Sequence, residues 1–243
     1  MMDFKIVHIE ETDSTNRWMK DMIDQHTIEE TQDPMVVVAE YQTAGRGCGT
    51  NSWESEAGKN LLCSVLIHPQ KVSARTQFII TQIVSVALCQ TLSQYISAPI
   101  EIKWPNDIYV GDKKICGVLI ENRIHGRRIK DCIIGIGLNI NQTTFRSDAP
   151  NPVSIKQITN KEVDRDEFLN TFLSLLDKAC NNKNMHQDYL NRLYRREGKH
   201  PFMTKGIRFE ASIVGVNDDG RLMLQDEKGV AHLFAFKEVQ FII

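Results

Sequence analysis

The sequence of 243 residues predicts an α+β fold, in which a mixed, largely antiparallel sheet is flanked by helices and followed by a small β-barrel. The sheet is indicated by short apolar and β-branched runs in the middle of the chain. Two-residue turns, Gly111-Asp112 and His125-Gly126, join these runs and are short enough for hairpins. The barrel is indicated by the change after Pro201 to four or five short strands with tight turns in about 40 residues.

The predicted elements of the sheet follow in chain order. A helix begins at residues 13–16, where cap-forming side chains precede apolar residues that share one face between positions 18 and 23. From Ala74 to Ile96 apolar residues recur mostly at three- and four-residue steps, which predicts the longest helix of the chain. The strands that we expect in the sheet cover residues 35–40, 60–67, 100–104, 107–110, 114–123 and 129–140.

The last third of the chain begins with a polar, irregular stretch from Asn151 to about Glu162. An amphipathic helix is predicted over residues 166–180, with a polar continuation to about Gly198. The strands expected in the barrel cover residues 208–216, 221–226, 230–236 and 238–243. We therefore divide the chain into a large domain, residues 1–198, and a small domain, residues 199–243.

Composition restricts the kinds of partner. The formal net charge of −2 provides no overall positive field for nucleic acid or for an anionic membrane surface. No apolar run approaches the ~18–20 residues of a transmembrane helix, and the first residues lack the profile of a secretory signal. The six cysteines are widely spaced without a CxxC pair, which favours reduced thiols over a disulfide scaffold or zinc site. We expect a cytoplasmic protein that contacts no membrane.

Several polar motifs interrupt the apolar runs. "GRGCGTNSW", residues 45–53, is too rich in glycine for an ordinary turn, although it lacks the Walker and dinucleotide-binding patterns and a flexible loop would also explain it. "KWPND", residues 103–107, is better explained as a strand-exit turn when it is taken alone, and a hairpin charge pair would also explain Lys114. Two glycines lie in the expected strand 129–140, where they weaken a strand unless something packs closely on them.

Taken together, these motifs resemble the biotin–protein ligases. The chain shows "ETDSTN", "EYQTAGRGCGTNSW", "IKWPNDIYV", "GDKKICGVLIE" and "IGIGLNIN" in the order of that family and at plausible spacings. The resemblance covers Ile9 to Asn141 and continues weakly through "VNDDGRLML", which is similar to the family's SH3-like C-terminal domain. It implies the biotin/lipoate ligase fold, related to that of class II synthetases.

The resemblance implies an ATP-dependent ligase that converts biotin to biotinyl-5′-AMP and transfers it to a lysine of a biotin carboxyl carrier protein or domain. Both steps gather negative charge on oxygen, so the protein must supply fixed cations and N–H donors. Arg46, Lys114 and Lys103 would be catalytic, and Asp107 would hold Mg²⁺. Arg46 and Lys114 would also contact biotin, and Arg46 and Lys103 would also contact ATP. The other implied ligands of biotin are Ser14, Thr15, Asn16, Gln42, Gly45, Gly47, Cys48 and Gly117, and those of ATP are Asn51, Trp53, Asn106, Asp107 and Asn139.

The chain departs from the family pattern at Cys48, where most relatives have arginine or another long polar residue. Loss of this charge leads us to expect faster release of biotinyl-AMP than in arginine-bearing relatives, unless backbone N–H groups of Gly49 and Thr50 compensate. Only twelve residues precede Asp13, too few for the operator-binding winged helix of some relatives, so we expect no DNA binding.

Two alternatives stay open. A lipoate or octanoate ligase has a similar fold, although lipoate does not need the ureido-pairing set at residues 14–16. A non-catalytic module that binds a carrier or nucleic acid through the barrel is disfavoured, because the barrel mixes acidic and basic residues without a basic, aromatic face. The oligomeric state is open, with a homodimer as one alternative.

Overall fold

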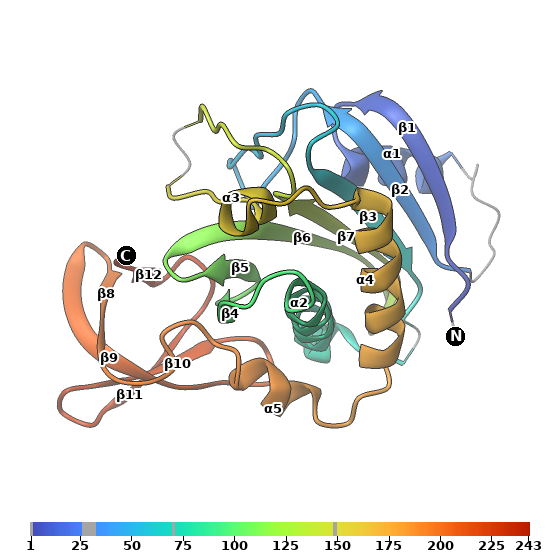
Figure 1. Cartoon of the computed structure of the whole chain (residues 1–243). Helices are drawn as coiled ribbons and strands as arrows, with labels where there is room; N and C mark the ends of the chain where they lie inside the picture. The colour runs from blue at the N-terminus through green and yellow to red at the C-terminus, as the bar shows by residue number, and fades with distance from the viewer. Residues whose placement is uncertain (1, 26–32, 70, 148–149) are drawn as a thin grey trace.

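A computed structural model describes residues 2–25, 33–69, 71–147 and 150–243 (Figure 1). Its main sheet has seven strands in the order β1-β2-β3-β7-β6-β5-β4. Only β1 and β2 pair in parallel among these described strands, and every other neighbouring pair is antiparallel. The strands are β1 (Lys5–Thr12), β2 (Met35–Gln42), β3 (Leu61–Ile67), β4 (Ile100–Lys103), β5 (Asp107–Val110), β6 (Lys113–His125) and β7 (Arg128–Leu138). The predicted mixed, largely antiparallel sheet is confirmed.

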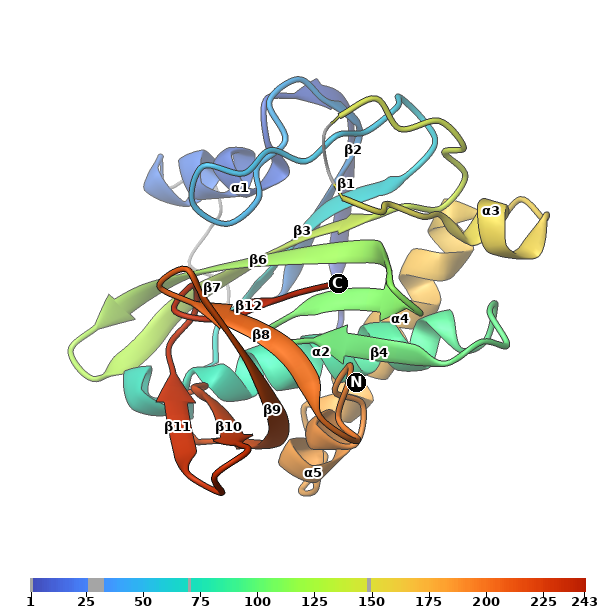
Figure 2. The ribbon, with the colours of Figure 1, turned by 90° about the vertical axis from the view of Figure 1, so that its left-hand side faces the viewer.

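Helices cover both faces of this sheet. Figure 2 shows α1 (Thr15–Asp24) on one face and α2 (Phe78–Leu92) with α4 (Arg165–Ala179) on the other. The short elements are the 3₁₀ turn η1 (Ala74–Thr76), α3 (Ile155–Thr159) and α5 (Met185–Leu190), and α5 packs on α2. The central helix α2 is buried along most of its length, which explains its strongly apolar sequence.

The core follows the two-residue period of the strands. Val36 and Val38 of β2 point into the large cluster beneath α2 and α4. Met35 and Val37 point to the opposite face, where they pack with Met19 of α1. Because α1 is short, it covers only part of this face of the main sheet. The rest of the face is not covered by a helix in the part of the chain that the structure describes.

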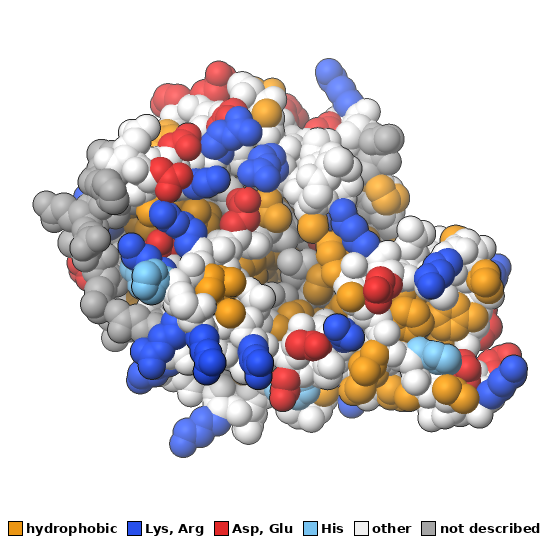
Figure 3. All heavy atoms as spheres, turned by 180° about the vertical axis from the view of Figure 1, so that it is seen from behind, with side chains coloured by type: hydrophobic (Ala, Val, Ile, Leu, Met, Phe, Trp, Pro, Cys, Tyr) orange, Lys and Arg blue, Asp and Glu red, His pale blue; other side chains and the backbone are white. Residues whose placement is uncertain are grey.

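Residues 200–243, which we call the C-terminal barrel, form a second sheet in the order β11-β10-β9-β8-β12. Its strands are β8 (His200–Thr204), β9 (Ile207–Val216), β10 (Leu222–Asp226), β11 (Ala231–Phe234) and β12 (Gln240–Phe241). The indole N–H of Trp104 donates to the carbonyl of Gly220 at 2.9 Å and ties the barrel to the main sheet. Hydrophobic side chains gather on the barrel surface in Figure 3. Ile207 and Leu233 of the barrel are exposed.

The sequence-based boundaries fail at several places, and α3 lies in the stretch that was predicted to be irregular. Strand β1 was not predicted, because its alternation is mixed with charged residues and it lies at the exposed edge of the sheet. Strand β8 was not predicted because it contains Pro201. The expected helix from Ala74 to Ile96 divides into η1 and a shorter α2. In the described part of the chain, no helix has both the length and the apolarity to cross a bilayer.

Candidate active site

A cavity of about 700 Å³ lies on the face of the main sheet that α1 leaves uncovered. It brings together the five sequence motifs, which come from α1, the loop after β2, the β4–β5 turn, β6 and β7. All but one of the predicted site residues line it. These are Ser14, Thr15, Asn16, Gln42, Arg46, Gly47, Cys48, Asn51, Trp53, Lys103, Asn106, Asp107, Lys114, Gly117 and Asn139.

Gly45 does not line the cavity. It is buried, and a Cβ atom there would lie 2.5 Å from the carbonyl oxygen of Trp53. Its own carbonyl accepts a hydrogen bond from Trp53 N–H at 2.9 Å. The structure gives Gly45 a structural role, since it allows the two ends of the glycine loop to approach each other, and its predicted contact with biotin stays a prediction.

The glycine loop, residues 45–53, is folded as a small hairpin. Arg46 pairs with Ser52, and Gly47 N–H donates to the carbonyl of Asn51 at 2.7 Å. Gly49 at its tip has φ +70°, a left-handed conformation that favours glycine. The loop is thus an ordered lip of the cavity with Arg46 near its base.

Glycines of two neighbouring strands form part of the cavity floor. Gly117 of β6 and Gly137 of β7 are directly paired across the strands. The indole of Trp53 lies on both: a Cβ at Gly137 would be 2.5 Å from Trp53 Cε2, and one at Gly117 would be 2.9 Å from Cζ3. The strand glycines therefore provide the close approach that their presence in a central strand requires. Trp53 Nε1 is buried and has no hydrogen-bond partner among the described residues.

The start of α1 forms the polar end of the cavity. Ser14 is the N-cap residue, yet its side chain makes no cap hydrogen bond to any described residue, so its hydroxyl is not used by the helix. The Gln42 carbonyl oxygen instead accepts from the backbone N–H of Thr15 at 2.8 Å and from its hydroxyl at 3.1 Å. Gln42 therefore holds the helix start in place and leaves Ser14 facing the cavity.

Two residues that sequence reasoning missed orient Asn16. The Ser64 hydroxyl lies 2.6 Å from Asn16 Oδ1 and 2.8 Å from the Thr15 hydroxyl. Glu121 accepts from Asn16 Nδ2 at 2.7 Å and lies 3.6 Å from the guanidinium of Arg46. The available signals were a serine inside the apolar run 60–67 and an acidic residue at the end of the "GVLIE" motif.

Asn16 also explains a third glycine. A Cβ at Gly135 of β7 would collide with Asn16 Oδ1. The amide group of Asn16 donates to the carbonyl of Leu119 at 3.3 Å as well as to Glu121, so both of its N–H groups are used. Asn16 Oδ1 accepts from the Ser64 hydroxyl and keeps one further acceptor site that no described residue uses.

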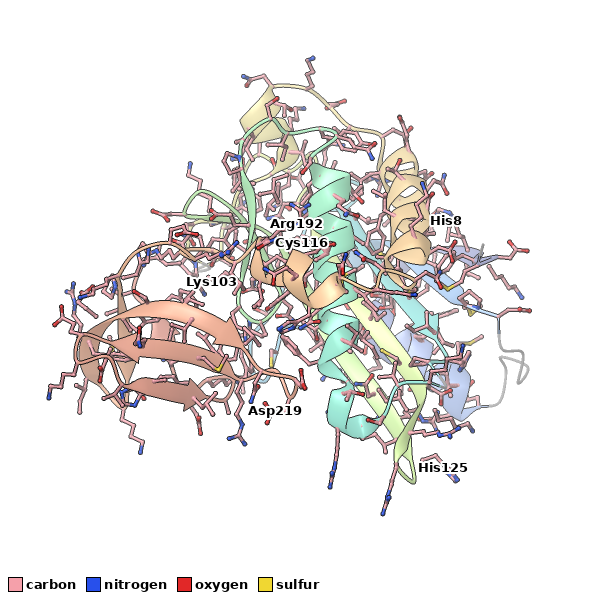
Figure 4. The ribbon with its side chains drawn as sticks, turned by 90° about the horizontal axis from the view of Figure 1, so that it is seen from below. His8, Lys103, Cys116, His125, Arg192 and Asp219 are labelled. Carbon is pink, nitrogen blue, oxygen red and sulfur yellow. The ribbon has the colours of Figure 1, made fainter. Side chains whose placement is uncertain are left out.

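Lysines form the opposite, charged end. Lys114 Nζ lies 2.7 Å from Asp107 Oδ1 and 5.7 Å from the centre of the Trp53 ring. Lys103 lies between the rings of Tyr109 and Phe241, 5.4 and 5.3 Å from their centres. Burial lowers the pKa of Lys103 below its usual 10.5; Asp107 opposes this shift, while Lys114 and Arg195 add to it. Figure 4 shows Lys103 on the side of the main sheet nearest the C-terminal barrel.

Two amides and one aromatic ring complete the charged end. Asn106 Nδ2 donates to the carbonyl of Val118 at 3.0 Å, and Asn139 Nδ2 donates to that of Val153 at 3.1 Å. Asn139 Oδ1 is buried and lacks a hydrogen-bond partner in the described residues. Phe236 of the C-terminal barrel also lines the cavity, which the sequence did not predict because it depends on how the barrel packs.

Metal-binding groups are sparse. Within the ranges that the structure describes, no three His, Cys, Asp or Glu side chains are clustered as a metal site. Asp107 is the one carboxylate among the described residues that line the cavity. Such a site fits a cation held mainly by a ligand's phosphates, since Mg²⁺ usually takes only one or two protein carboxylates there.

Known proteins are similar to this chain in sequence and in fold. The model of the biotin/lipoate A/B protein ligase family matches residues 9–139. The bifunctional ligase/repressor BirA of Bacillus subtilis is 27% identical over 222 residues, which is 82% of this chain. The biotin–[acetyl-CoA-carboxylase] ligase of Mycobacterium tuberculosis is 25% identical over 205 residues, covering 79% of this chain and 73% of its own. This chain spans 64% of the length of the Bacillus relatives.

The solved structures agree in fold. The biotin protein ligase from Aquifex aeolicus in complex with biotin and ATP superposes with a TM-score of 0.79 at 22% identity, over 98% of this chain and 99% of that one. The biotin acetyl coenzyme A carboxylase synthetase from Helicobacter pylori gives a TM-score of 0.67 at 19% identity, over 96% of this chain.

Proposed function

Because the chain belongs to the biotin/lipoate A/B protein ligase family, we propose that it activates biotin with ATP and transfers it to a lysine of a carrier protein. The observation that carries this proposal is the convergence of the five motifs on one cavity with a polar end, a glycine floor and a cationic end. The names of the similar proteins, biotin–protein ligases among them, support the same activity.

The polar end fits the ureido ring of biotin, which has two N–H donors and one carbonyl acceptor. Buried groups of this kind must be paired to avoid a desolvation penalty. The free acceptor site of Asn16 Oδ1 suits a ureido N–H, and the unused Ser14 hydroxyl suits the ureido carbonyl. Thr15 and Gln42 hold this set in place. A lipoyl or octanoyl tail would leave these groups unpaired, which favours biotin over the lipoate alternative.

The cationic end fits the reacting groups. The biotin carboxylate attacks the α-phosphate of ATP, an acyl phosphate bond forms, and pyrophosphate leaves. Arg46 and Lys114 lower the repulsion between the two anions, and Lys103 supplies a further positive charge. In the second step the lysine amine of the carrier attacks the acyl carbon, loses a proton and displaces AMP. Positioned cations and donors are enough for both steps, so no protein nucleophile is required.

The nucleotide fits the remaining residues. Trp53 offers an aromatic face for adenine, and Asn51, Asn106 and Asn139 offer amides, with the unpartnered Asn139 Oδ1 able to accept a hydrogen bond. Asp107 is the residue that we assign to Mg²⁺, which would neutralise charge on the phosphates when bound. Lys114, which contacts Asp107 in this structure, is the residue that we assign to the acyl oxygen.

The partner that we assign is the biotin carboxyl carrier protein or domain of an acyl-CoA carboxylase. We place the catalytic activity in residues 1–198 and a supporting SH3-like domain in residues 199–243, in a cytoplasmic enzyme. A homodimer is compatible with this assignment, which does not depend on the oligomeric state.

Purified protein incubated with biotin, ATP, MgCl₂ and a carrier domain tests the proposal. We expect the carrier to gain the mass of one biotinyl group, and Arg46→Ala to reduce the rate severely. Parallel reactions with lipoate or octanoate give the specificity. If lipoate but not biotin is transferred, the proposed substrate is wrong. If no adenylate forms with any of these acids, the proposed activity is overturned.

A further inference from the structure

A turn of the C-terminal barrel reaches the glycine loop of the active site. The turn, residues 235–238, connects β11 with β12, and its Phe236 lines the cavity. The next residue, Lys237, places its ammonium group against Gly49 at the tip of the loop, where an added methyl group would collide with Lys237 Nζ. The barrel therefore contacts the glycine loop through a charged side chain.

The backbone conformation of this turn gives no reason for a lysine at position 237. Lys237 has φ +69°, a left-handed conformation that glycine or asparagine adopts more easily. The turn is held on both sides: Glu238 N–H donates to the carbonyl of Ala235 at 3.0 Å, and Ala235 N–H donates to the Glu238 carboxylate at 2.7 Å. A residue in a strained conformation that its surroundings fix is a reason to look for a role of its side chain.

The small number of positive charges on the glycine loop indicates a role for the Lys237 side chain. Residues 45–53 contain a single basic side chain, Arg46, which lies 3.6 Å from the Glu121 carboxylate. Position 48 carries an uncharged cysteine that lines the cavity. Lys237 brings a second positive charge to this loop from another part of the chain, at the residue next to Cys48.

We infer that Lys237 is a positioning residue, which holds the glycine loop closed over the acyl-adenylate and supplies the positive charge that the loop lacks at position 48. The inference rests on the proposed ligase function. Lys237 acts through the loop, because its ammonium contacts Gly49 while the cavity itself is lined by Cys48 and Phe236. Its effect should therefore be on retention of the anionic intermediate more than on binding of biotin.

Release of biotinyl-AMP tests the inference. The protein is loaded with biotin and Mg-ATP in the absence of carrier, and bound and free biotinyl-AMP are separated over time. We expect Lys237→Ala and Lys237→Gly to release it about two- to fivefold faster, the range for one exposed charge contact. Lys237→Arg should keep the slow rate. Cys48→Arg in the Lys237→Ala background should restore it.

Two controls separate charge from folding. Lys237→Gly suits the left-handed backbone, so it removes the charge while relieving strain. Lys205→Ala removes a lysine from another turn of the barrel that also has positive φ, +49°, and should release the intermediate at the unchanged rate.

The outcomes are distinct. If the unchanged protein forms biotinyl-AMP but Lys237→Gly retains it equally well, or Lys237→Arg loses it as fast as Lys237→Ala, the role of Lys237 is overturned and the ligase function stands. If the unchanged protein forms no biotinyl-AMP, the ligase function is overturned and the inference with it.

Discussion

The indole of Trp53 lies directly on the backbone of Gly137, with Cε2 only 2.5 Å from the position that a Cβ atom would occupy. The two residues are 84 positions apart in the sequence and meet because the glycine loop folds back over β7. The absence of a side chain at Gly137 therefore fixes how deep the aromatic ring can lie, and with it the shape of the cavity floor.

Gly137→Ala should displace Trp53 and damage the site without unfolding the protein. The strand conformation tolerates alanine, which loses less backbone entropy on folding than glycine by about 0.5–1 kcal/mol. We expect affinity for ATP to fall about tenfold, since a stacking partner is worth about 1–3 kcal/mol per base. Calorimetric titration with ATP and thermal denaturation measure the two effects.

The matched control for this substitution is Gly215→Ala in β9 of the barrel. There an added methyl group meets only the flexible end of Met223, at 2.7 Å. Nucleotide affinity should be unchanged. An equal loss of ATP affinity in both variants would mean that the contact with Trp53 is not the cause.

Lys114→Ala should lower the rate of adenylate formation about 10²- to 10³-fold, the typical cost of losing a group that stabilises transition-state charge. Affinity for biotin should change little, because Lys114 lies at the cationic end with Asp107. Neighbouring side chains along a strand point to opposite faces, so Lys113→Ala is the control and should keep full activity. Biotin-dependent ATP–pyrophosphate exchange gives the rate. A normal exchange rate in Lys114→Ala would remove this lysine from the mechanism.

Ser64→Ala should weaken biotin binding about five- to tenfold. The hydroxyl of Ser64 supports both Thr15 and Asn16, and a hydrogen bond of this kind contributes about 1 kcal/mol, more when its loss leaves a buried acceptor unpaired. Calorimetry with biotin measures the change. Ser85→Ala is the control, because the buried Ser85 hydroxyl has no hydrogen-bond partner in the described residues and its removal should leave biotin affinity intact. An unchanged affinity in Ser64→Ala would show that Asn16 does not need this support.

The sequence could predict which residues meet in the cavity because they occur in short motifs at strand ends and turns. Each of these motifs taken alone has a structural explanation, but five of them in order indicate a common function. Gly45 was the exception, since a glycine needed for close approach of the loop ends has the same appearance as one that contacts a ligand.

The rest of the site depends on contacts between distant segments. Ser64 lies in an apolar run that predicts only a buried strand, and its partner Asn16 is 48 positions away. Phe236 and Lys237 reach the site through the packing of the barrel, which no local pattern encodes. Strand β1 likewise depends on its parallel partner β2 more than on its own weak alternation.

Lys103→Met should stabilise the free protein at neutral pH and weaken ATP binding. Burial lowers the pKa of Lys103, so between its folded value and 10.5 the unfolded chain binds more protons than the folded one. The charged lysine therefore costs stability at pH 7, and this cost disappears as the pH rises through that window. Methionine has no such cost, so the free energy of unfolding of the variant should exceed that of the unchanged protein at pH 7, and the difference should narrow at pH 9.5. Loss of a charged partner for phosphate should lower ATP affinity about tenfold or more. Urea denaturation at the two pH values, with calorimetry for ATP, measures both effects, and a stability difference that widens with pH would contradict the assignment of a buried, charged Lys103.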